Sequence, residues 1–435
     1  MTQVAERDET YAARFEAARR AGGAEPEAVR AARTGAFDRF LSRGFPTTRD
    51  EEWRFTSVAA LAALTPASPA VAEPARADVE PFLLPTPGAH HVVVVNGRFA
   101  PALSSIDGLP AGVTVRSLRD AWTSGAGLDL DAPVPAPPGA TVFVDLNTAF
   151  VEDGVWIEIA PKAVVTEPLQ VLFLTTAPGA VHVTPWLGIT AGERSQAFVV
   201  ESYAGLTADA SFTDAVTRIA VAAGARLEHV KLMRESTSVF HLASTFIRAD
   251  RGAVCTSRAI TLGGRVARND IHAELAGEGA EVTLDGVYVA DGESLVDTHT
   301  TIDHAQPHCP SHEVYKGILG GRARAVFNGK IIVRQDAQKT DAKQTNKALL
   351  LSDDAQINTK PQLEIFADDV KCTHGAAIGQ LDEDQLFYLR ARGVSVADAR
   401  NMLIHAFAGD VLDRIGDAAV RDEALRLIDR KLRLA

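Results

Sequence analysis

A glycine followed by an alanine and a short strand-like run recurs in the middle of the chain at a nearly fixed interval. Ala225, Ala253 and Ala280 carry the repeat with spacings of 28 and 27 residues, and we expect Ala355 to continue the series. A period in the twenties, built from strand and turn without helix, is typical of a solenoid whose strands stack turn upon turn. A β-sandwich would supply a similar number of strands but no regular period, so we favour the solenoid.

The repeat lies inside a long region, residues 90–380, in which short β-branched runs are separated by turn residues. Strands of this kind are predicted at residues 91–95, 141–146, 155–159, 169–175, 197–201 and 215–221. No helical tract of the kind needed for βαβ units lies between them. We therefore expect residues 90–380 to form a mainly β core.

Helical segments are predicted on both sides of this core. In residues 1–64 and 381–435, apolar side chains recur at three- and four-residue steps, as on the buried face of a helix. Residues 65–89 contain six prolines, which is typical of a linker. A second passage rich in proline, alanine and glycine, residues 124–140, is expected to form a long surface loop.

Apolar faces in both helical segments need burial. In the C-terminal segment, Met402, Leu403 and Phe407 lie on the apolar face of one predicted helix. This face would pack either against the end of the solenoid or against a partner protein. In the N-terminal segment, Trp53 and Phe55 follow a sequence typical of a helix start, and we expect both to pack internally.

Charge and cysteine content exclude several classes of protein. The formal net charge is −12, and no basic block supplies the phosphate contacts that nucleic-acid-binding proteins need. Three cysteines without a CxxC motif do not indicate a disulfide framework and fit a reducing compartment. No apolar run approaches the ~18 residues that cross a bilayer. We therefore expect a cytoplasmic protein that binds neither nucleic acid nor membrane.

Histidines are concentrated in residues 297–312. The group contains His299, His304, His308, Cys309 and His312. Imidazole and thiolate at this density can bind zinc or iron. However, alternate residues of a strand face opposite sides, so His299 and His304 would point in opposite directions. We therefore favour a structural role with hydrogen bonds between turns over a metal site.

Cys372 and His374 form a second candidate site. Their two-residue spacing places both on one face of an extended strand. A thiolate and an imidazole there can bind a soft or borderline metal, but two ligands do not complete a tetrahedral site. A buried thiol beside a hydrogen-bonded histidine is an equally good interpretation of these residues alone. Complete motifs for a phosphate loop, a dinucleotide site, a serine hydrolase or an HExxH zinc site are absent from the sequence.

Several longer motifs resemble the SufB/SufD family of iron–sulfur cluster assembly proteins. They include Phe-Asn-Gly-Lys at 327–330, Gln-Lys-Thr-Asp-Ala at 338–342, Asn-Lys-Ala-Leu-Leu-Leu-Ser at 346–352, Lys-Pro-Gln-Leu-Glu-Ile at 360–365, Lys-Cys-Thr-His-Gly at 371–375 and Asp-Gln-Leu-Phe-Tyr-Leu at 384–389. The resemblance is dense from residue 269 to 407 and weaker at 52–56. Gly375 stands where SufB is expected to carry an acidic residue, and the chain is short for SufB, so the resemblance favours the other branch of the family.

The resemblance implies a fold, partners and a site. It implies a right-handed parallel β-helix between helical N- and C-terminal domains. It also implies a scaffold subunit, not an enzyme, in a complex with SufB and the ATPase SufC. His374, with Cys372 beside it, would lie at the interface with SufB and contact iron or a transient cluster, and no cofactor would be held tightly. The C-terminal helices, with Met402, Leu403 and Phe407, would bind SufC, and the isolated chain is a possible homodimer.

Two alternatives from other classes stay open at this point. A free-standing β-helix enzyme acting on polysaccharides would need carboxylates or basic groups gathered in a groove, whereas the sequence shows only scattered aspartate pairs. A self-contained metal-binding protein would use the histidines of residues 297–312.

Overall fold

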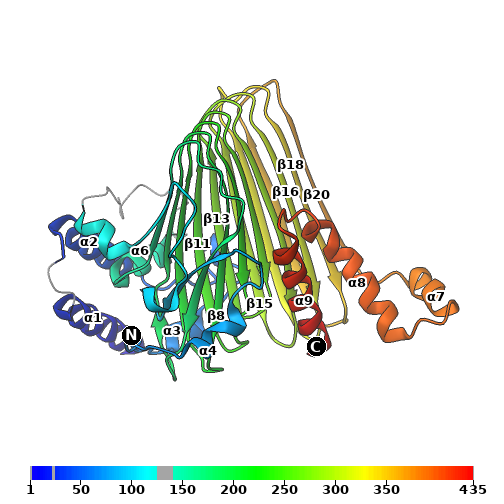
Figure 1. The fold of residues 1–435 in the computed structure, drawn as a ribbon. Coiled ribbons are helices and arrows are strands. Elements are labelled where there is room, and N and C mark those ends of the chain that lie inside the picture. Colours follow the sequence, from blue (N-terminus) through cyan, green and yellow to red (C-terminus); the bar gives the residue numbers. More distant parts are fainter. Residues whose placement is uncertain (1, 22–24, 125–140, 435) are drawn as a thin grey trace.

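A parallel β-solenoid forms the centre of the molecule, with helices at both ends of the chain (Figure 1). The computed structural model describes residues 2–21, 25–124 and 141–434. Nearly all of the loop expected at residues 124–140 therefore lies outside the described residues. The mainly β fold predicted from the period is confirmed.

The solenoid is built from two sheets of ten strands each. In spatial order, the first sheet contains β2 (Arg98–Phe99), β1 (His90–Val95), β5 (Leu169–Thr175), β8 (Gln196–Gly205), β10 (Arg226–Met233), β12 (Val254–Thr261), β14 (Glu281–Ala290), β16 (Pro310–Leu319), β18 (Asp341–Leu350) and β20 (Lys371–Gly379). The second contains β19 (Gln356–Ile365), β17 (Arg324–Val333), β15 (Leu295–His304), β13 (Val266–Leu275), β11 (Phe240–Ala249), β9 (Phe212–Val221), β7 (Trp186–Ala191), β4 (Val155–Ile159) and β3 (Val113–Ser117), with β6 (His182–Val183) beside β9.

From β7 onward, successive strands of the chain alternate between the two sheets, so each turn of the coil adds one strand to each. All neighbouring strands are parallel except β1 with β2 and β3 with β4. Side chains that point between the sheets form one continuous apolar core, which runs from Val92 in β1 to Ala367 just after β19.

The alanine repeat marks the point where the chain enters the first sheet. Ala225, Ala253 and Ala280 are fully buried, and the strands that they precede pair in register, Arg226 with Val254 and Val254 with Glu281. The expectation that Ala355 continues this series is wrong, since it precedes β19 in the second sheet.

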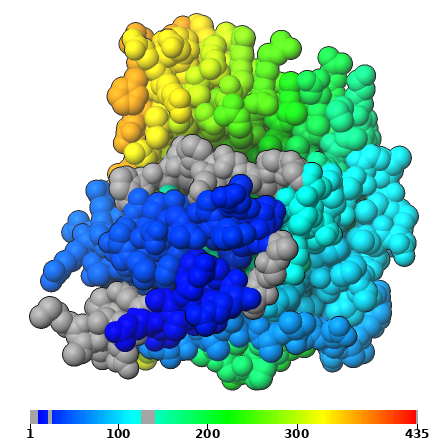
Figure 2. All heavy atoms as spheres, turned by 90° about the vertical axis from the view of Figure 1, so that its left-hand side faces the viewer, coloured from blue at the N-terminus to red at the C-terminus, as the bar shows by residue number. Residues whose placement is uncertain are grey.

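Most N-terminal helices cover the outer face of the second sheet. These are α1 (Thr2–Ala21), α2 (Glu27–Arg43), α3 (Ala59–Ala63), α5 (Leu118–Thr123) and α6 (Val142–Phe150), with the short 3₁₀ turn η1 (Glu51–Trp53). Helix α4 (Arg76–Val79) and the 3₁₀ turns η2 (Glu80–Phe82) and η3 (Pro101–Leu103) pack instead on the outer face of the first sheet. Figure 2 shows the first part of the chain, in blue, across the lower half of one face, while green to orange strands remain visible above it.

Two expectations for this region are wrong. The β-branched run predicts a strand at residues 141–146, but Thr141 is the N-cap of α6 and residues 142–146 lie in this helix, which is buried along its whole length between α2 and the sheet. A run of β-branched and aromatic residues suits either a buried strand or a buried helix, so periodicity alone does not separate the two. Trp53 is buried as expected, whereas Phe55 is 44% exposed and lines an open cleft between its loop and the second sheet.

Three C-terminal helices, α7 (Glu383–Ala391), α8 (Val396–Leu412) and α9 (Ala418–Leu434), follow the last strand. Asp382 and Ser395 cap α7 and α8 by accepting hydrogen bonds from backbone N–H groups of the first turn. α8 and α9 pack on the outer face of the first sheet through residues such as Ile404, Leu412 and Ile428. No helix within the described residues has the length and apolar character needed to cross a bilayer.

Candidate functional site

The last turn of the solenoid is uncovered. β20 ends the first sheet and β19 ends the second, so each pairs with a neighbour on one side only. Nearly every residue of β20 is exposed, and β19 is half-buried or exposed throughout, whereas earlier strands such as β14 are mostly buried. This end of the solenoid therefore presents free backbone groups and the inner face of its last turn.

Cys372 and His374 both lie on β20, in register with Ala342 and Gln344 of β18. Cys372 is half-buried and packs against the core between the sheets, and burial raises the pKa of its thiol. His374 is exposed. Because side chains two residues apart share a face, both residues lie on the face of β20 that continues the inner core.

Directly behind His374, the same inner position is polar in the two preceding strands of its sheet. Gln344 stacks in register on Glu313, and its side-chain amide donates a hydrogen bond of 2.7 Å to the Glu313 carboxyl. Both side chains are almost completely buried, and burial raises the pKa of Glu313 to about 7. A polar column therefore leads from the exposed histidine into the apolar core.

The described residues contain no group of three or more His, Cys, Asp or Glu side chains placed to hold a metal ion. Cys372 and His374 would therefore supply at most two ligands to iron. Further ligands to the metal ion would have to come from a second protein or from sulfide bound together with the metal.

The histidines of residues 297–312 do not converge. His304 points into the core, where its Nε2 lies 2.9 Å from the hydroxyl of Ser311. His299 is on the outer face, 3.0 Å from Asp297 and 3.2 Å from Glu52. His308 lies on an exposed turn with a positive φ of 59°. The structural role favoured for these two strand histidines agrees with their hydrogen bonds and ion pairs.

The C-terminal helices leave part of their apolar surface exposed. Met402 is 51% exposed, and Leu403 lines a cavity of about 360 Å³ between α7 and α8 with Tyr388 and Leu389. Phe407 differs from Met402, because its ring is half-buried and lies 4.9 Å from the ammonium of Lys316 on β16. Phe387 and Tyr388, which are 71% and 55% exposed, extend the exposed surface, and sequence reasoning did not single them out.

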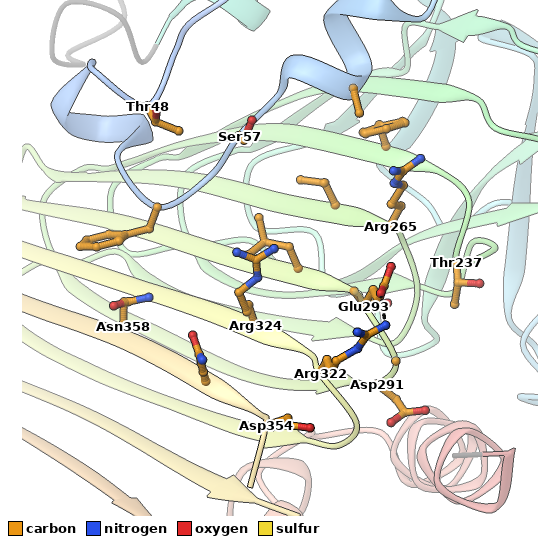
Figure 3. Close-up of a pocket in the computed structure, with 18 of the residues that line it drawn as sticks. Thr48, Ser57, Thr237, Arg265, Asp291, Glu293, Arg322, Arg324, Asp354 and Asn358 are labelled. Atoms are coloured by element: carbon orange, nitrogen blue, oxygen red, sulfur yellow. Dashed lines mark hydrogen bonds and ion pairs between the residues drawn. The ribbon is translucent and has the colours of Figure 1, made fainter. Parts of the chain in front are cut away.

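A cleft of about 1390 Å³ was also missed from the sequence. It lies between the loop at residues 48–60, the starts of the strands of the second sheet, and the end of α9 (Figure 3). Five cationic residues line it: Arg54, Arg265, Arg322, Arg324 and Lys431. They are spread over most of the chain without a motif, so only the coiling of the solenoid brings them together.

Comparison with known proteins identifies the family. Residues 173–407 match the SufBD core domain of the SUF system for iron–sulfur cluster assembly, and residues 5–171 match the SufBD N-terminal region. The chain is 31% identical to the iron–sulfur cluster assembly protein SufD of Escherichia coli over 90% of both chains. It is 34% identical to an iron–sulfur cluster assembly SufBD family protein of Synechocystis over 89% of this chain and 88% of that one. It is also 34% identical to the chloroplast protein ABCI7 of Arabidopsis thaliana over 55% of this chain and 51% of that one.

These matches cover both the helical N-terminal segment and the solenoid with its uncovered last turn. The chain therefore belongs to the SufBD family and takes part in iron–sulfur cluster assembly.

Proposed function

We propose that this chain is a scaffold subunit without a catalytic centre of its own, which binds SufB through the last turn of its solenoid and the ATPase SufC through its C-terminal helices. The observation that carries the proposal is the uncovered end formed by β19 and β20. The complex would work in the cytoplasm, which agrees with three cysteines that form no disulfide.

The uncovered end is suited to pairing with another strand. An unpaired edge offers a row of N–H and C=O groups to any chain that can continue the sheet. The last turn also has apolar side chains such as Ile357, Leu363 and Cys372, which pack against the core on one side only. Another solenoid of the same family would continue both sheets and bury this face. In the absence of SufB, the last turn of a second copy of this chain would pair with the uncovered end in the same way and form a homodimer.

Iron or a growing cluster would be held at this interface as cargo. Neutral imidazole binds ferrous iron, and a thiolate binds both iron and clusters. His374 is exposed and Cys372 lies beside it on the same face, so SufB residues facing them could complete the coordination. No tightly bound cofactor is needed in the isolated chain.

The test for the metal-binding role is the iron and sulfide content of the complex co-expressed with SufB and SufC. His374→Asn is expected to leave assembly intact and lower the cluster content severalfold, and Cys372→Ser to lower it less. His308→Asn is the matched control, because His308 is exposed on a turn whose positive φ suits asparagine. A His374→Asn complex that assembles with full iron and sulfide content would refute this role.

The test for the ATPase contact is co-purification of SufC. Met402→Asp combined with Tyr388→Asp places charge on the exposed surface of α7 and α8, so we expect loss of SufC and retention of SufB. Val164→Asp is the control, because Val164 is 57% exposed and lies outside these helices. Undiminished recovery of SufC by the folded double variant would exclude this surface as the dock.

A further inference from the structure

The cationic cleft between the N-terminal loop and the second sheet is electrostatically unusual for this protein. The whole chain has a formal net charge of −12, yet the cleft lining holds five cationic residues against three acidic ones, Asp291, Glu293 and Asp354. Figure 3 shows Arg265 on the turn before β13 and Arg324 at the start of β17, with Asp291, Glu293 and Arg322 on turns near the red helix α9.

Three of these cations have no acidic partner within the described part of the chain. Arg322 forms an ion pair with Glu293. By contrast, no ion pair to a described carboxylate is found for Arg54, Arg265 or Arg324, all of which are exposed. The guanidinium groups of Arg54 and Arg265 lie instead over the rings of Phe55 and Phe240, at 5.7 Å and 5.5 Å. The cleft therefore offers uncompensated positive charge next to apolar rings.

The cations are arranged along the axis of the solenoid. Arg265 directly precedes β13 and Arg324 begins β17, and β15 lies between these strands. Two strand spacings amount to about 10 Å. A peptide in the extended polyproline II conformation advances by about 3.1 Å per residue with three residues per turn, so acidic side chains three residues apart would lie on one face and match this separation.

We propose that the cleft binds an acidic segment of a partner protein, in an extended conformation that runs across the strands. The volume of about 1390 Å³ exceeds the roughly 300–1,000 Å³ of a small-molecule pocket. The cations also come from separate walls, Arg54 from the loop and Lys431 from α9, which suits a linear chain of charges better than one compact anion. The inference does not depend on what pairs with β20.

Binding is tested with the full-length protein and a fluorescein-labelled peptide of about twelve residues that carries glutamate at every third position. The control peptide has glutamine in place of each glutamate. We expect the acidic peptide to bind and the glutamine peptide to bind at least about tenfold more weakly, with an affinity that falls as salt rises. The triple variant Arg54→Gln, Arg265→Gln, Arg324→Gln is expected to lose about tenfold or more in affinity.

A second triple variant distinguishes binding in the cleft from a general effect of the protein's net charge. Arg119→Gln, Arg226→Gln, Arg251→Gln changes the net charge equally at exposed positions outside the cleft, and it is expected to bind like the wild type. Equal binding by the cleft variant and the wild type would overturn the proposal. So would binding of pyrophosphate in the cleft without binding of the peptide, because that result would assign the cleft to a small anion.

Discussion

The covered turns and the last turn of the solenoid follow the same strand pattern but differ in what surrounds their residues. Gly317 in β16 lies so close to the ring of Tyr288 that an added Cβ would overlap it, and Gly286 is held in the same way by Tyr315. At Gly375 in β20, an added Cβ would meet nothing within 4 Å. A parallel solenoid has no means of ending its own hydrogen-bond ladder, so its last turn stays ready to bind unless another element covers it.

The largest expected effect concerns a buried charge in the covered part. Arg268 is fully buried, lies 3.8 Å over the ring of Trp53, and pairs with Asp270 and Asp297, each at 2.7 Å. Arg268→Ala leaves two buried carboxylates without their cation, so we expect a loss of ~3–5 kcal/mol in the free energy of unfolding, measured with urea. Arg248→Ala, at an exposed pair with Glu274, should cost less than ~1 kcal/mol. If both variants lost a similarly small amount of stability, burial of Arg268 under the N-terminal segment would not make this position more sensitive to substitution than an exposed one.

The glycine comparison gives the next effect. Gly317→Ala forces a methyl group into the space of the buried Tyr288 ring, and we expect a cost of ~1–3 kcal/mol in urea unfolding. Gly375→Ala should stay within ~0.5 kcal/mol of the wild type in the isolated chain, because the site is open. If Gly375→Ala destabilised as much as Gly317→Ala, the last turn would have to be covered in solution.

A third effect, of similar size to that of Gly317→Ala, depends on pH and on the contact between the N-terminal loop and the covered turns. Burial and Arg268 lower the pKa of His299, but Asp297 and Glu52 outweigh them and raise it from 6.5 to about 8. The protonated form is thus stabilised on folding, so this contribution is fully present below about pH 6.5 and is lost as the pH rises through about 8. The difference corresponds to about 2 kcal/mol.

The measurement is the free energy of unfolding at about pH 6 and about pH 9 for the wild type and for His299→Gln. The stability advantage of the wild type should shrink by about 2 kcal/mol between the two values. The same pH dependence in both proteins would mean that His299 does not link the loop to the solenoid through its charge.

Much of the architecture followed from the sequence because a solenoid is governed by local repetition. The alanine spacing predicted stacked strands, and the apolar side chains at three- and four-residue steps in residues 381–435 predicted the C-terminal helices. Errors occurred where burial came from distant segments. Residues 141–146 form a helix because α2 and the second sheet enclose them, and the orientation of Phe55 depends on a loop that crosses the sheet.

The sequence by itself determined the strand period, the family motifs and the shared face of Cys372 and His374, since each depends on residues close together in the chain. Only the tertiary structure decided that this face is uncovered, that Phe407 is held against Lys316, and that Arg54, Arg265 and Arg324 meet in one cleft. The physical reason is that exposure and electrostatic environment are set by neighbours from other turns and from the flanking helices, and no local pattern records which segments those neighbours are.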